Sequence, residues 1–178
     1  KKWIEPSKLK KQYINNKPYP HIVLPNFFND KIVTKVLKEF PDLSKQTKKT
    51  VKTFNKKNEI KFASKGSTLL SPSAKKLIFF LNSDIFLSYL QTLTDIKETL
   101  ISDPYLNGGG YHEIKKGGFL KIHADFNKHP NLELDRRINL LLYLNKNWNE
   151  SWGGDFQMFD KNMNGPIKKI YPHFNTCV

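Results

Sequence analysis

The sequence changes its hydrophobic pattern at Asn107, which is followed by three consecutive glycines. Before this point apolar residues recur at helical spacing, and after it short apolar runs alternate with turns. We predict strands at residues 111–115, 119–124, 138–144, 155–159 and 167–171. Helices followed by strands predict an α+β fold in which N-terminal helices buttress an all-β core. Antiparallel strands with glycine-rich corners favour a core rolled into a double-stranded β-helix, a jelly-roll or cupin-like barrel.

Local capping signals predict three helices in the N-terminal half. Ser71 followed by Pro72 is typical of a helix start, because serine caps the first turn and proline suits the first helical position. Ser83 predicts a second start, and Asn29 or Asp30 predicts a third. The third helix carries an apolar stripe that is expected to bury one face, made of Ile32, Val33, Val36, Leu37 and Phe40.

Two other N-terminal segments have no helical pattern. Residues 21–24 are predicted to form a short buried strand ended by Pro25, and residues 44–65, rich in lysine, threonine and serine, a mobile excursion. The 178 residues suit one domain with a hydrophobic core. We predict a single domain over residues 1–178, with helical support over about 1–100 and the β core over about 101–178. Its last residues are interpreted as a strand cut in mid-run, so C-terminal strands are expected to be missing.

The chain is strongly basic, with 30 Lys and Arg against 16 Asp and Glu and a formal net charge of +14. Such an excess favours an anionic partner such as nucleic acid. However, only Arg136 and Arg137 are arginines, and arginine is the preferred reader of phosphate and guanine. Residues 1–66 hold 17 lysines against 5 acids, which indicates a solvated basic surface and makes nucleic acid an improbable partner.

Two absences bear on the cellular setting of the chain. No apolar run approaches the roughly 20 residues that span a bilayer, and no signal-peptide pattern opens the sequence. The one cysteine, Cys177, cannot form an internal disulfide, so nothing indicates secretion. We expect a cytoplasmic protein with no membrane partner.

The pair His123 and Asp125 is the strongest chemical signal in the chain. On an extended segment these side chains project to the same side, so an imidazole and a carboxylate can share one metal ion. They make up two thirds of the 2-His-1-carboxylate triad that holds Fe(II) and leaves positions open for substrates. Taken alone, His-x-Asp is a weak signal, and a surface histidine beside a solvated aspartate is the alternative.

The pieces around this pair occur in a specific order. Residues 103–106 lead into the triple glycine, followed by residues 111–114, 117–120 and 123–127. Next come residues 136–145, which include Leu-Tyr-Leu-Asn, then Trp148 and Gly153-Gly154. This series resembles the Fe(II)/2-oxoglutarate-dependent dioxygenases of the prolyl 4-hydroxylase-like superfamily over about residues 100–178. Residues 20–28 are similar to the opening strand of the same enzymes.

The resemblance implies roles for particular residues. It makes His123 and Asp125 the first two iron ligands, and makes Tyr143 a contact of the distal carboxylate of 2-oxoglutarate. Asn139 and Leu141 alternate with Tyr143 on one strand face, so they are expected to line the same pocket. A core aromatic is an equal alternative for Tyr143. The implied cofactors are Fe(II) and 2-oxoglutarate, with ascorbate to rescue oxidised iron.

Other polar residues are given structural roles. The two arginines are interpreted as solvated residues at the strand entry, and Gly153-Gly154 as a tight barrel corner. The remaining histidines have no partner at ligand spacing and are interpreted as structural or surface residues: His21, His112, His129 and, except as a weakly favoured ligand, His173.

The chain departs from the family pattern at two points. Many prolyl hydroxylases have a tyrosine about ten residues before the metal histidine, where this chain has Glu113, so 2-oxoglutarate binding is expected to differ. The second triad histidine is absent, because the family places it beyond the strand that residues 172–178 begin. In the family, the basic residue that pairs with the 2-oxoglutarate carboxylate follows this second histidine.

The implied activity is hydroxylation of an unactivated C–H bond, most simply on a peptidyl proline, with O2 consumed and succinate and CO2 as co-products. A small metabolite or sugar is an alternative substrate. A catalytically inactive barrel used as a binding or structural module is a further alternative. A nucleic-acid demethylase of the same iron-dependent class is a fourth alternative, and only the positive net charge supports it.

Overall fold

The computed structural model of the chain describes residues 3–103, 105–130 and 132–178. Pro104, one of the motif residues, and Asn131 therefore lie outside the described residues. Contacts group the chain into two compact units. The first unit comprises Lys1–Thr34, Ser83–Ile101 and Arg137–Val178, and the second comprises Lys35–Asn82 and Ser102–Arg136. Both contain helix and antiparallel pairing, which confirms the α+β class.

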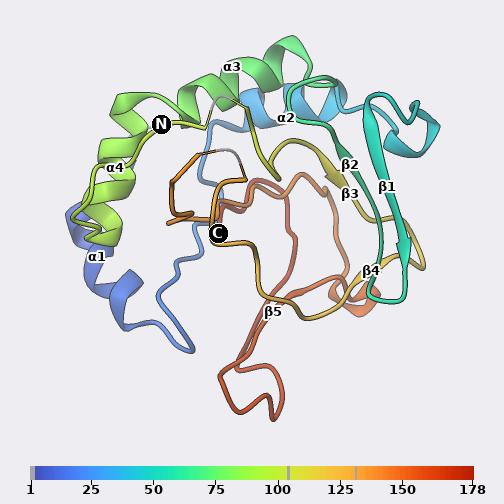
Figure 1. Cartoon of the computed structure of the whole chain (residues 1–178). Coiled ribbons are helices and arrows are strands. Elements are labelled where there is room, and N and C mark those ends of the chain that lie inside the picture. The colour runs from blue at the N-terminus through green and yellow to red at the C-terminus, as the bar shows by residue number, and fades with distance from the viewer. Residues whose placement is uncertain (1–2, 104, 131) are drawn as a thin grey trace. The chain divides into compact units, whose positions relative to one another are not determined.

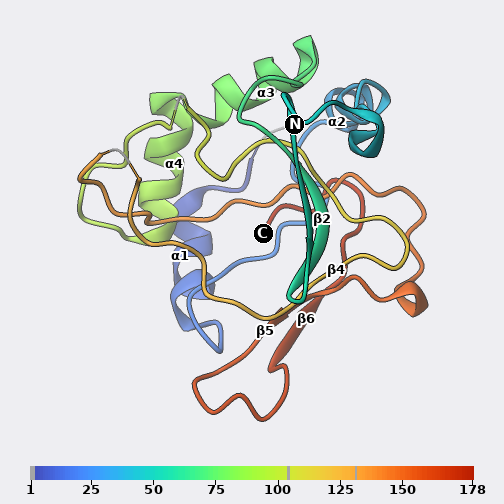
Figure 2. The same cartoon turned by 45° about the vertical axis from the view of Figure 1, so that its right-hand side comes forward.

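In the first unit, helices α1 (Pro6–Asn15) and α4 (Asp84–Thr94) pack side by side (Figure 2). The predicted start of α4 is confirmed, because the Ser83 side chain accepts a hydrogen bond from the Phe86 amide. Helix α1 was not predicted. An aromatic cluster forms the core beside α4, and its members are Trp3, Phe27, Phe28, Phe86 and Tyr89.

The predicted strands of the first unit are shorter than expected. Strand β5 (Phe156–Met158) pairs with β6 (Lys168–Ile170), and the two run out into a loop (Figure 2). Residues 138–144 form no regular strand, although the backbone of Leu141 and Tyr143 pairs with residues 175–178. The predicted strand at 21–24 is reduced to one bridge between Leu24 and Cys177. In the part of the chain that the structure describes, these pairings do not close into a barrel.

The second unit contains a four-stranded sheet (Figure 1). Strands β1 (Val51–Lys56) and β2 (Glu59–Ser64) form an antiparallel hairpin, and β2 also pairs with β3 (His112–Glu113) and β4 (Phe119–Leu120). The prediction that residues 44–65 are a mobile excursion is therefore wrong. Within the strands, Lys52 lies between Val51 and Thr53 and Lys61 between Ile60 and Phe62, and β-branched and aromatic residues favour a strand. The predicted strand at 119–124 ends early, at Leu120.

Helices of the second unit begin where the capping signals placed them. The Ser71 side chain accepts a hydrogen bond from the Ala74 amide and starts α3 (Pro72–Leu81). Helix α2 (Asp30–Lys38) begins in the first unit and ends in the second, with Val33 and Val36 buried but Ile32 exposed. None of the described helices is alone long and apolar enough to cross a membrane, although α3 and α4 taken together pass that test of length and composition.

Candidate metal site and its surroundings

His123 and Asp125 lie in a segment without regular secondary structure that follows β4 in the second unit. The distance from His123 Nε2 to Asp125 Oδ1 is 3.4 Å, and both side chains are nearly half exposed. The two side chains therefore project to the same side, as expected for residues two apart on extended chain.

The imidazole of His123 is oriented by its own backbone. Its Nδ1 lies 2.7 Å from the Lys121 carbonyl oxygen. Because a carbonyl oxygen only accepts, Nδ1–H can donate to it, and Nε2 is the ring nitrogen directed at Asp125. Histidines that bind metals usually donate their second N–H to a carbonyl or carboxylate in this way.

Asp125 is oriented by Arg136, which the sequence did not indicate as part of the site. Arg136 Nη1 lies 3.4 Å from Asp125 Oδ2, on the oxygen not directed at His123. The Arg136 guanidinium also lies over the Phe126 ring, 4.5 Å from its centroid, and its side chain is only 24% exposed. The interpretation of Arg136 as a solvated strand-entry residue is therefore wrong, and no local pattern could show a contact between residues eleven apart.

The triple glycine supports the same cluster. Gly108 has a φ of +74°, and a Cβ on it would lie 2.8 Å from the Phe126 ring. Only glycine allows this backbone conformation and this approach together. Gly108, in the turn at residues 107–110, thus packs against the Phe126 ring, and the Arg136 guanidinium lies over the same ring.

The donor set fits two of the three protein positions of a facial triad. Ligand atoms about 2.1 Å from one divalent ion and about 90° apart at the ion lie about 3 Å from each other. The 3.4 Å separation of His123 and Asp125 is close to this value. Across residues 3–103, 105–130 and 132–178, no three histidine, cysteine, aspartate or glutamate side chains form a metal-binding group.

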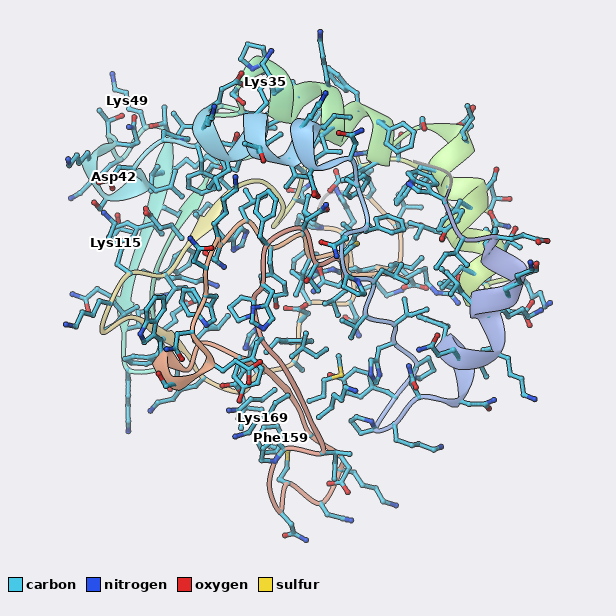
Figure 3. All side chains as sticks on the ribbon, turned by 180° about the vertical axis from the view of Figure 1, so that it is seen from behind. Lys35, Asp42, Lys49, Lys115, Phe159 and Lys169 are labelled. Atoms are coloured by element: carbon cyan, nitrogen blue, oxygen red, sulfur yellow. The ribbon has the colours of Figure 1, made fainter. Side chains whose placement is uncertain are left out.

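Glu113, which replaces the family's tyrosine, has a structural contact. Its Oε2 accepts a hydrogen bond of 2.9 Å from the Leu43 amide. Next to it, Lys115 Nζ lies 2.6 Å from Asp42 Oδ1 (Figure 3), and this hydrogen bond is the main cause that lowers the pKa of Asp42. Glu113 and Lys115 therefore join β3 and the segment after it to the turn at residues 42–45.

The residues predicted to hold 2-oxoglutarate belong to the first unit. Tyr143 is held by backbone hydrogen bonds to Thr176 and Asn175, and burial raises the pKa of its phenol to about 12. It is therefore a neutral hydrogen-bond donor. Asn139 and Leu141 line an apolar cavity of about 230 Å³, and Tyr143 is not part of its lining.

The remaining predicted residues have local partners. The ring of His21 is buried beside the Tyr19 carbonyl, and the ring of His129 contacts Asn107. His173 Nε2 lies 3.2 Å from Glu150 Oε1, so a second histidine–carboxylate pair exists in the first unit. Arg137 forms an ion pair with Glu98 at 2.9 Å.

The expected tight corner at Gly153-Gly154 is present. Both glycines have positive φ, at 72° and 71°. The Trp148 indole donates a hydrogen bond of 3.1 Å to the Gly153 carbonyl.

One comparison with known proteins bears on this site. Residues 109–178 match the family model of the 2OG-Fe(II) oxygenase superfamily. The matched segment contains His123, Asp125 and Tyr143. The match supports an oxygenase function, with Fe(II) and 2-oxoglutarate as cofactors and a substrate and O2 as partners. The family implies a jelly-roll core, of which the described residues contain antiparallel pairings but no closed barrel.

Proposed function

We propose that this chain is the iron-binding part of a 2-oxoglutarate-dependent oxygenase that hydroxylates a peptidyl proline and releases succinate and CO2. The observation that carries the proposal is the pairing of His123 and Asp125, with each side chain oriented by a further group. A ferrous ion bound there would supply the O2-activating chemistry, with 2-oxoglutarate as the electron source and ascorbate as the reductant that restores the ferrous state.

The residues of the chain itself would bind and orient. His123 Nε2 and Asp125 Oδ1 would be the two donors, and the Lys121 carbonyl would accept from Nδ1–H while Nε2 binds the ion. Arg136 holds Asp125 Oδ2 and thereby leaves Oδ1 directed at the metal position. Tyr143 is the proposed contact of 2-oxoglutarate, because a neutral phenol donates to a carboxylate without repelling it. Asn139 and Leu141 line a cavity to which Tyr143 does not contribute, so they are not proposed to share this contact.

The prolyl substrate is supported by the resemblance of about residues 100–178 to the prolyl 4-hydroxylase-like superfamily. The test measures succinate formation by the protein with Fe(II), 2-oxoglutarate and ascorbate. We expect proline-containing peptides to stimulate turnover and to gain one oxygen atom by mass spectrometry. The same peptides with alanine in place of proline are the control. Turnover that no peptide stimulates would exclude the prolyl substrate and favour a small metabolite.

The orienting role of Arg136 gives a separate prediction. Arg136→Gln is expected to weaken Fe(II) or Mn(II) binding by about 10- to 100-fold, the range found when groups that orient metal ligands are lost. Titration by calorimetry under anaerobic conditions measures the affinity.

The neighbouring arginine provides the matched control. Arg137→Gln changes the charge equally, and the partner of Arg137 that the structure shows is Glu98. Metal affinity is therefore expected to stay at the wild-type value in this variant. Equal losses in both variants would show a general charge effect and contradict the orienting role.

A further inference from the structure

The hairpin of β1 and β2 concentrates positive charge on an exposed edge of the second unit. Residues 45–65 contain eight lysines and one acid, Glu59. Glu59 is already paired with Lys61 at 3.1 Å. Five exposed lysines of this segment have no carboxylate partner within the described residues: Lys48, Lys49, Lys52, Lys56 and Lys57.

Strand β1 is also open to a further strand. Among the described residues it pairs with β2 alone, and from Lys52 to Lys56 no residue of it is buried. An edge strand with both faces accessible presents unpaired backbone N–H and C=O groups to any extended chain. These groups match the backbone of another peptide strand.

The side chains of β1 indicate what such a strand would carry. Lys52, Phe54 and Lys56 project to one face, with the two lysines about 13 Å apart along the strand. Phe54 lies between them and is half-buried under Lys61, whose Nζ is 5.0 Å from the ring. Directly opposite residues on paired strands interact most favourably when charges are opposite and apolar groups meet.

We propose that the free edge of β1 binds an extended acidic peptide by strand addition, with Asp or Glu opposite Lys52 and Lys56 and an apolar residue opposite Phe54. A peptide fits better than a nucleic acid, because it satisfies the backbone groups of the edge. Lysines on edge strands also protect against aggregation, and this protective role is the competing explanation. The proposal does not rest on the oxygenase function, because binding needs neither iron nor 2-oxoglutarate.

The test uses the protein as it is, without metal, and a fluorescent peptide of about eight residues that has Glu, Val and Glu at successive alternate positions, with threonines between them, so that these three side chains share one face. We expect binding by fluorescence anisotropy that weakens sharply between about 0.05 M and about 0.5 M salt, because exposed charges are screened. Amide NMR shifts are expected to concentrate on residues 51–56. Lys52→Glu with Lys56→Glu is expected to weaken binding by about tenfold or more.

Two controls keep the outcome decisive. Lys75→Glu with Lys76→Glu changes the net charge equally on exposed positions of α3 and is expected to leave the affinity within about twofold of wild type. A peptide of the same sequence with N-methylated backbone amides keeps the charges but cannot pair as a strand, so it is expected to bind weakly. Absence of binding, equal loss in both charge-reversal variants, undiminished binding of the methylated peptide, or tighter binding of a single-stranded oligonucleotide would each overturn the proposal.

Discussion

Replacing either His123 or Asp125 with alanine is expected to abolish Fe(II) binding, with at least a roughly 100-fold loss of affinity for each variant. Each variant removes one of the two donors that lie 3.4 Å apart, and a single remaining side chain cannot hold the ion against water. The fold is expected to remain intact, because both side chains are nearly half exposed and fill no core position. Anaerobic calorimetry with Fe(II), or with Mn(II) as a substitute, measures the affinity, and circular dichroism checks the fold.

The second histidine–carboxylate pair provides a matched control for this prediction. His173 lies 3.2 Å from Glu150, a separation similar to that of His123 and Asp125, but the two residues are 23 apart in the chain. His173→Ala is expected to leave metal affinity unchanged. If His173→Ala removed binding while His123→Ala did not, the metal site would lie in the first unit and our assignment would be wrong.

Asn175→Asp is expected to lower the free energy of unfolding by about 3–5 kcal/mol, the range for a buried charge left without compensation. Asn175 is fully buried, and its amide NH2 donates to the Phe28 carbonyl at 2.8 Å and to Asp30 Oδ1 at 2.6 Å. Its Oδ1 accepts from the Phe28 amide at 3.0 Å. An aspartate could still accept from Phe28, but its second oxygen would face two acceptors, one of them a carboxylate.

Urea denaturation at neutral pH measures the loss of stability in this variant. The introduced carboxyl is expected to have a raised pKa in the folded state, because burial and Asp30 disfavour its charge. The folded state then binds more protons than the unfolded state, so the variant loses stability as pH rises above the unfolded value of about 4. The difference from wild type is therefore expected to shrink towards pH 4 and to grow towards neutrality.

A substitution at a second asparagine tests whether the buried hydrogen bonds of Asn175 or its positive φ causes the expected loss of stability. Asn147 also has a positive φ, 55° against 58° for Asn175, but it is exposed. Asn147→Asp is expected to change stability by less than about 0.5 kcal/mol, as surface substitutions usually do. Similar losses in the two variants would show that the positive φ, rather than the buried hydrogen bonds, makes Asn175 important.

Features that depend on neighbours in sequence could be predicted. Ser71 and Ser83 start helices because a serine side chain satisfies amides within the next turn, and this needs no other part of the chain. His123 and Asp125 lie together for a similar reason, since extended backbone places residues two apart on one side. The order of motifs over about residues 100–178 was sufficient to indicate the oxygenase superfamily, whose family model matches residues 109–178.

Composition misled the prediction where it was used without periodicity. Residues 44–65 were interpreted as mobile because of their lysines, although Val51, Thr53 and Phe54 favour a strand. The long aliphatic part of a lysine side chain allows it to stand on an exposed strand face. The sequence of residues 44–65 therefore permits either a loop or a hairpin. In the structure the hairpin forms, and its strand β2 also pairs with β3 and β4, which are far away in sequence.

The sequence by itself determined the starts of α2, α3 and α4, the shared direction of His123 and Asp125, and the family likeness, because each depends on spacing along the chain. Only the tertiary structure decided that Arg136 orients Asp125, that Gly108 supports Phe126, and that Asn175 joins Phe28 across 147 positions. These contacts arise between segments whose approach depends on how the whole unit packs. The order of residues along the chain shows the chemical type of each side chain, but not the distance between side chains that meet in the folded structure.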